Sequence, residues 1–161
     1  MPTSFQGLPL HPLIVHATVV LVPLAALTVA LSALWPRFRR WAGPMPLGLA
    51  IVGLILVPLS TSTGETLERH VPHSALVEAH TRLADGLLPW MIALSVVAAA
   101  GYLIQRLASS GRSVSRALVA GVAVLAVVGA TGTAVQVARI GHSGAKAAWA
   151  STQMNSSPEG N

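Results

Sequence analysis

The sequence predicts an all-α integral membrane protein, a four-helix bundle whose helices run alternately up and down through the bilayer. The chain of 161 residues is 53% hydrophobic and only 9% charged, whereas soluble domains carry about 25% charged residues. Four apolar stretches come close to the roughly 20 residues that a bilayer core requires; they occupy about 13–35, 46–62, 85–105 and 117–138. All 4 tryptophans lie near the predicted ends of these stretches, as in the aromatic belts of membrane proteins.

The first two spans are bounded by residues that begin or end helices. Pro12 suits the first turn of a helix, where its missing N–H has no partner to lose, and Pro23 predicts a kink in the middle of the span. This helix is expected to end near Trp35. The second span begins around Pro46 and ends in the polar run 60–63.

A further helix is expected before the third span. From Ser74 onward, apolar residues recur at helical spacing and predict one apolar face, made of Leu76, Val77, His80, Leu83, Ala84 and Leu87. Pro89 should bend or restart this helix. In the fourth span, small residues predict close packing between helices. Residues 1–150 are thus expected to form one membrane domain, and 151–161 a disordered tail.

The charges predict an orientation. Six arginines and no acidic residue follow the first span or separate the third from the fourth, namely Arg37, Arg39, Arg40, Arg106, Arg112 and Arg116. Because Lys and Arg favour cytoplasmic loops, both termini are expected to be extracytoplasmic. The composition is typical of a multi-pass protein of the bacterial plasma membrane. The basic residues lie at helix ends rather than in one patch, so a nucleic-acid partner is not expected.

Histidines gather on the predicted extracytoplasmic side, where all 6 histidines and all 5 acidic residues fall. His16 should lie about 6 Å inside the first helix and face the bundle interior, as intramembrane ionisable residues usually do. His11 is expected just outside that helix, His80 on the apolar face after Ser74, and His142 beyond the end of the fourth helix. The candidate ligands are therefore His11, His16, His80 and His142.

Each candidate also has a structural interpretation. His16 could be a neutral imidazole bonded to a backbone carbonyl, His11 an interfacial polar residue, and His142 a complement to the dipole of the fourth helix. Glu65 is expected either to bind a metal or to orient a ligating histidine. Gln136 is expected either to bind another helix or to donate to a ligand.

The chemistry of these residues favours haem b or a transition metal such as copper or zinc. With 0 cysteines, imidazole and carboxylate must supply the ligands. The predicted cytoplasmic end has no histidine, so one haem exchanging electrons with a quinone or an external partner is favoured over two stacked haems. No hydrolytic or transferase motif is present, and any catalytic role is at most that of an electron-transfer component.

Several motifs resemble those of the domain-of-unknown-function 2231 family of small bacterial membrane proteins. The run from His11 to His16 is similar to the opening motif of the family, and Thr63-Gly64-Glu65, His80 and Gly141-His142-Ser143-Gly144 are similar to its later motifs. The resemblance implies four membrane helices over nearly the whole chain. It also implies a redox association, because some relatives occur beside or fused to redox modules. The chain departs from the first motif at Ala17-Thr18, where an aromatic residue and proline are expected.

An alternative function is that of a non-redox accessory subunit. In that case the small residues of the fourth helix would pack against a larger membrane complex or a second copy of the chain. The histidines would then form a structural or pH-sensitive network.

Overall fold

The structure is a computed structural model that describes residues 4–5, 8–68 and 74–154, with side chains over 13–65 and 74–149. Two short strands, β1 (Ser4–Phe5) and β2 (Leu8–Pro9), pair antiparallel before the first helix. Six helices follow, and they are α1 (Leu10–Leu34), α2 (Pro36–Ala42), α3 (Met45–Glu68), α4 (Ala75–Asp85), α5 (Leu87–Ser109) and α6 (Arg116–Met154).

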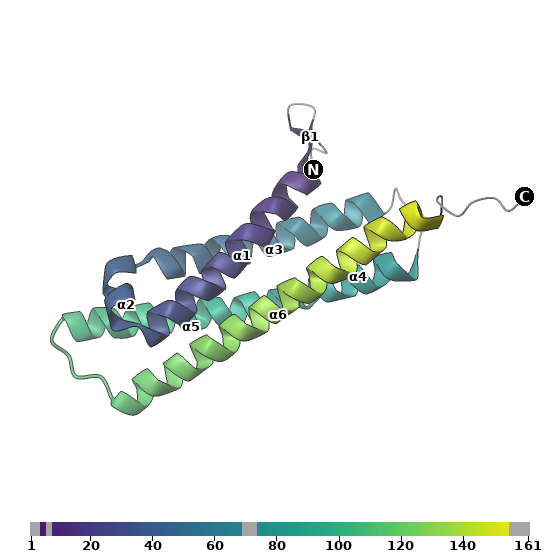
Figure 1. Cartoon of the computed structure of the whole chain (residues 1–161). Helices are drawn as coiled ribbons and strands as arrows, with labels where there is room; N and C mark the ends of the chain where they lie inside the picture. Colours follow the sequence, from purple (N-terminus) through teal and green to yellow (C-terminus); the bar gives the residue numbers. More distant parts are fainter. Residues whose placement is uncertain (1–3, 6–7, 69–73, 155–161) are drawn as a thin grey trace, which may run out of the picture.

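The predicted four-helix membrane fold is confirmed. Four segments are long and apolar enough to cross a membrane, namely Leu13–Leu34, Met45–Glu65, Ala75–Ser109 and Arg116–Trp149. Helix α1 packs on α3 and α6, and α5 also packs on both, so the helices that follow one another in the chain are neighbours in space (Figure 1). The short α4 leads into α5 and packs on α6.

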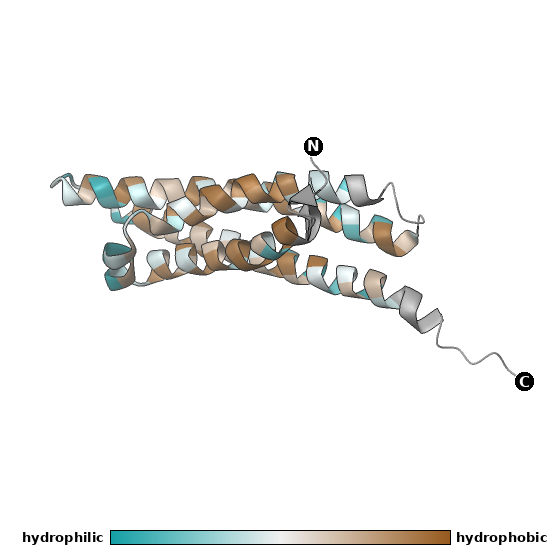
Figure 2. Cartoon of the chain, turned by 90° about the horizontal axis from the view of Figure 1, so that it is seen from above, coloured by the Kyte–Doolittle hydropathy of each residue, from teal (hydrophilic) through white to brown (hydrophobic). Residues whose placement is uncertain are grey.

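The bundle has two chemically different ends. One, which we call the histidine end, is formed by the start of α1, the end of α3, α4 and the end of α6 (Figure 1). The other, the arginine end, is formed by α2 and the α5–α6 loop. Hydrophobic residues cover the helices between the two ends, while α2 is largely hydrophilic (Figure 2). Exposed side chains such as Val20, Val96 and Val124 suit contact with lipid.

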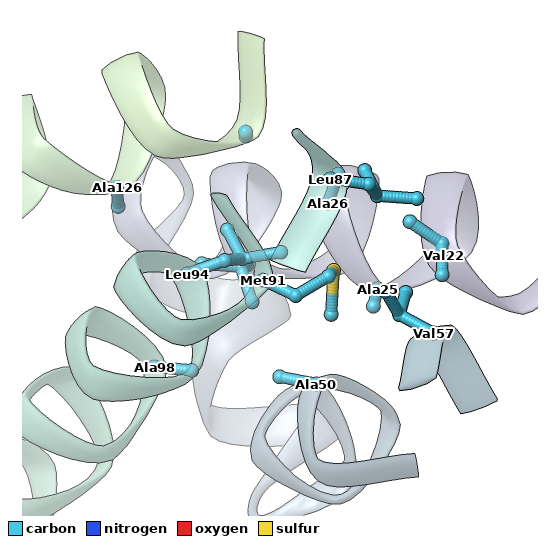
Figure 3. Packing of buried hydrophobic residues seen from close by; sticks show 12 residues of the cluster. Val22, Ala25, Ala26, Ala50, Val57, Leu87, Met91, Leu94, Ala98 and Ala126 are labelled. Carbon is cyan, nitrogen blue, oxygen red and sulfur yellow. The ribbon is translucent and has the colours of Figure 1, made fainter. Parts of the chain in front are cut away.

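The core consists of small and medium side chains at the centre of the bundle (Figure 3). Val22 and Ala25 of α1 meet Ala50 and Val57 of α3, and Met91 of α5 is fully buried. A methyl group on Gly53 would lie 2.7 Å from Cε of Met91. Because lipid gives helices no hydrophobic reason to associate, this close approach of small residues stabilises the bundle through van der Waals contact.

Buried and partly buried hydrogen bonds join neighbouring helices. The Ser95 hydroxyl donates to the Ala50 carbonyl at 3.2 Å, and Nε2 of Gln136 donates to the Leu83 carbonyl at 2.6 Å. Leu83 lies in the last turn of α4, where carbonyls lack helical partners. Gln136 therefore binds another helix, as one of the two sequence interpretations held.

Two predicted helix boundaries are wrong, and one short helix was not predicted. Helix α1 already begins at Leu10, so His11 lies inside it. Residues 36–42 form a separate helix, α2, because Pro36 starts it and Gly43, with φ of 54°, ends it. Helix α6 does not end near 138; it continues through Gly141 and Gly144 and includes the first four residues of the predicted tail, 151–154.

Candidate ligand cavity

A cavity of about 470 Å³ lies at the histidine end, between α1, α3, α4, α6 and the start of α5. Ligand-binding pockets usually measure about 300–1,000 Å³, so its size suits a small organic ligand. The residues that line it are Val15, Thr18, Val19, Val57, Ser60, Thr61, Gly64, Glu65, Val77, His80, Thr81, Ala84, Leu87, Val137, Ile140, Gly141, Gly144 and Ala145.

Most of the wall is aliphatic. Val15 and Val19 contribute from α1, Val57 from α3, and Val137 and Ile140 from α6. Val19 is also 53% exposed, so this wall reaches the lipid-facing surface of the bundle. The cavity is therefore suited to an amphipathic ligand that enters from the bilayer.

His80 is the one histidine among the described residues that lines the cavity. It is half-buried, as the apolar face of its helix predicted. Its Nδ1 lies 2.9 Å from the Ser143 hydroxyl. The ring packs over Gly144, where an added methyl group would lie 3.1 Å from Cε1. Gly144 thus allows α6 to approach the imidazole closely.

The hydrogen bonds of Ser143 select one of the two neutral tautomers of His80. The Ser143 hydroxyl lies 2.9 Å from the Ile140 carbonyl, one turn earlier in α6. A hydroxyl has one proton, so both contacts are hydrogen bonds only when Ser143 donates to Ile140 and accepts from Nδ1–H of His80. When the ring is neutral, this is the Nδ1–H tautomer, whose Nε2 carries a lone pair, and no described group donates to it.

Several other polar groups of the wall can accept hydrogen bonds. The hydroxyls of Thr18, Thr61 and Thr81 donate to carbonyls of their own helices at 2.8–3.1 Å. The protons of these three hydroxyls are therefore engaged, while the hydroxyl of Ser60, which also lines the cavity, can both donate and accept. Glu65, an exposed residue near the end of α3, adds a carboxylate. The acceptors outnumber the donors in this wall, which favours a ligand that donates hydrogen bonds or is a Lewis acid.

The other predicted histidines do not join His80 in the wall. His16 is exposed, so the prediction that it faces the bundle interior is wrong; the residues of α1 that line the cavity are Val15, Thr18 and Val19. One residue corresponds to about 100° around a helix, which turns His16 away from that face. His142 is exposed on α6 rather than following it. The side chain of His11, and all of His70 and His73, lie outside the described residues.

Within the side chains described, over 13–65 and 74–149, no three His, Asp or Glu residues form a group that could hold a metal ion. Of the predicted ligands there, only His80 and Glu65 share the cavity. The histidine cluster is therefore reduced to one imidazole and one carboxylate in this part of the chain.

The sequence interpretation missed Ser143 and Gly144. It placed His142 beyond the end of the fourth helix and selected it as a ligand. Continued as a helix, the same motif places Ile140, Ser143, Gly144 and Ala147 at positions that share one face. This helical periodicity could have shown that Ser143 and Gly144 share the face that packs on His80.

A family model described as "Predicted membrane protein" of the domain-of-unknown-function 2231 group matches residues 7–156. No curated protein and no solved structure matches the chain significantly.

Proposed function

The chain belongs to the domain-of-unknown-function 2231 family of membrane proteins, and we propose that it binds an amphipathic, redox-active ligand in the cavity, anchored by His80. The carrying observation is the hydrogen bond from Nδ1–H of His80 to Ser143, which holds the ring and leaves the Nε2 lone pair for a ligand. A fixed imidazole in an apolar cavity is suited to bind one polar or Lewis-acidic centre of a largely apolar molecule.

Haem b is the first candidate ligand. Haem iron accepts an imidazole nitrogen as axial ligand, the aliphatic wall suits the macrocycle, and a single histidine is sufficient for one axial position. The Ser143 hydroxyl supplies the partner that orients a ligating histidine through its other nitrogen. His11, one helical turn before the lining residue Val15, is the sequence-predicted candidate for a second axial ligand.

A lipid-soluble hydroquinone is the second candidate, favoured by the acceptor character of the wall. A hydroquinone donates two O–H groups, to which Nε2 of His80 and the Glu65 carboxylate are suitable acceptors. The oxidised quinone has only carbonyl acceptors, to which neither Nε2 of neutral His80 nor the Glu65 carboxylate can donate. On this proposal the cavity prefers the reduced form.

Copper and zinc fit this cavity less well. Protein zinc sites use three or four protein ligands, and here His80 and Glu65 would need ligands from beyond the described side chains. The accessory-subunit alternative requires no ligand, and it predicts a colourless protein that co-purifies with a partner complex.

The test is an absorption spectrum of the detergent-purified protein before and after dithionite, with quinone and metal analysis of the same sample. A haem protein should show a Soret band that shifts on reduction. His80→Ala should abolish that band, whereas His142→Ala should retain it, because His142 is exposed and does not line the cavity.

If no band is present, the haem proposal fails, and the hydroquinone proposal then requires bound quinone that His80→Ala releases. A protein with neither haem nor quinone would overturn the ligand-binding function and favour the accessory subunit.

A further inference from the structure

The arginine end carries cations without matching anions. Arg37 and Arg40 of α2, Arg106 of α5, Arg112 of the loop and Arg116 of α6 are all exposed. The ion pair found among the described residues, Arg82 with Glu78, lies in α4. Segments 34–47 and 105–117 contain no acidic residue. This end therefore offers a positive surface to an anionic partner.

Three aromatic residues, Trp35, Phe38 and Trp41, alternate along the chain with the arginines of α2 and form an aromatic ladder. Trp35 stacks on Phe38 with ring centroids 6.5 Å apart, and Phe38 contacts Trp41 at 5.7 Å. Trp35 is 54% and Trp41 77% exposed. Tryptophan is enriched at the level of lipid headgroups, where its ring meets both apolar chains and polar groups. The aromatic ladder thus favours a membrane-surface partner over a water-soluble one.

Helix α2 is held in place against the bundle. Pro36 occupies its first turn, and Gly43 ends it with a backbone N–H bonded to the Arg39 carbonyl at 3.2 Å. The same carbonyl accepts from Nε2 of Gln105 in α5, also at 3.2 Å. Arg37 and Arg40, three residues apart, are neighbours on the surface of this fixed helix.

We propose that α2 is a binding site for the headgroup of an anionic phospholipid. Arg37 and Arg40 bind the phosphate, because the planar guanidinium matches phosphate geometry with two parallel hydrogen bonds. The aromatic ladder from Trp35 to Trp41 contacts the upper part of the acyl chains. This site is independent of the cavity at the histidine end.

The experiment titrates the purified full-length protein with phosphatidylglycerol or phosphatidylcholine and counts bound lipid by native mass spectrometry. The wild type should bind phosphatidylglycerol more tightly. Each basic residue near an anionic lipid surface contributes about fivefold in affinity, so Arg37→Gln with Arg40→Gln should weaken phosphatidylglycerol binding about 25-fold. Phosphatidylcholine binding should not change.

The matched control removes two cations from the opposite end. Arg139→Gln with Lys146→Gln lowers the net charge equally at exposed positions, and this variant should retain wild-type affinity. An equal loss in the control would show that total charge, not α2, attracts lipid and would overturn the site. Displacement of phosphatidylglycerol by millimolar inorganic phosphate would also overturn it, because the arginines would then recognise free phosphate.

Discussion

The two ends of the bundle satisfy their polar groups in different ways. At the histidine end, polar side chains reach across to other helices, as His80 does to Ser143 and Gln136 to the Leu83 carbonyl. At the arginine end, the described side chains make one comparable bond, from Gln105 to the Arg39 carbonyl. The other five arginines of this end are exposed. Polar groups of the histidine end therefore bind one another, whereas those of the arginine end are available to lipid, water or a partner.

Overpacking gives the largest expected contrast. A side chain at Gly132, in the half of α6 that leads to the histidine end, would overlap the ring of Trp90, whereas Gly121 nearer the arginine end has nothing within 4 Å. Gly132→Leu should therefore lower the free energy of unfolding by about 3 kcal/mol. Gly121→Leu should leave it unchanged or slightly raised, because leucine favours helix. Equal unfolding curves in mixed detergent micelles would contradict the contrast.

Gln136 and Gln105, one toward each end of the bundle, give the next largest difference. Gln136→Leu removes the donor to the Leu83 carbonyl from a position that is 9% exposed, and it should cost about 2 kcal/mol. Gln105→Leu removes a longer bond from a half-buried position at the arginine end and should cost about 1 kcal/mol or less. The same unfolding assay measures both. A larger loss in the free energy of unfolding for Gln105→Leu than for Gln136→Leu would contradict this prediction.

Ser143→Ala tests whether Ser143 orients the His80 ring for ligand binding, rather than testing stability. The substitution removes the acceptor of Nδ1–H of His80, so it should weaken ligand binding about fivefold, which corresponds to the roughly 1 kcal/mol of a typical hydrogen bond. Ser109→Ala is the matched control, because Ser109 also bonds a carbonyl of its own helix but lies at the arginine end. Ligand occupancy by absorption or by quinone extraction is the measurement. Normal occupancy in Ser143→Ala would mean that His80 needs no positioning partner.

The smallest effect is expected on the surface of α4. Arg82 bonds Glu78 at 2.6 Å, but the two side chains are 78% and 63% exposed. Exposed pairs at this spacing contribute about 0.3–0.5 kcal/mol. Arg82→Ala should thus lower the free energy of unfolding by about this amount and leave ligand occupancy unchanged. A loss of ligand in this variant would place Arg82 near the site and extend the cavity beyond its present wall.

Hydrophobicity and spacing were sufficient to predict the four spans and the inward position of His80. They also indicated that Gln136 forms a hydrogen bond inside the bundle. These features depend on local pattern, which a single sequence contains. The position of His16 could not be predicted in this way, because a shift of one residue in helical phase moves a side chain about 100°. The phase of α1 is set by its packing on α3 and α6, which is a tertiary property.

Glycine was the other source of error. Glycine often ends a helix, but Gly144 lies within α6, where the His80 ring packs close to the backbone. A glycine inside a helix lowers helix stability by roughly 1 kcal/mol. At Gly144 this cost accompanies the close packing of the His80 ring, for which a larger side chain would leave less room. The sequence contains the glycine but not the ring that approaches it. Likewise, no periodic pattern marked α2, since a helix of 7 residues is too short to show one.

The length of α6 has a consequence for where the cavity stands relative to the bilayer. Its 39 residues extend roughly 58 Å at 1.5 Å per residue, about twice the 30 Å thickness of the hydrocarbon layer. If Arg116 marks one boundary of that layer, Ser143 stands about 10 Å past the other. The imidazole of His80, bonded to Ser143, is then at headgroup height. A molecule dissolved in the lipid and a protein dissolved in the water could each reach the same site, one from the side and the other from above.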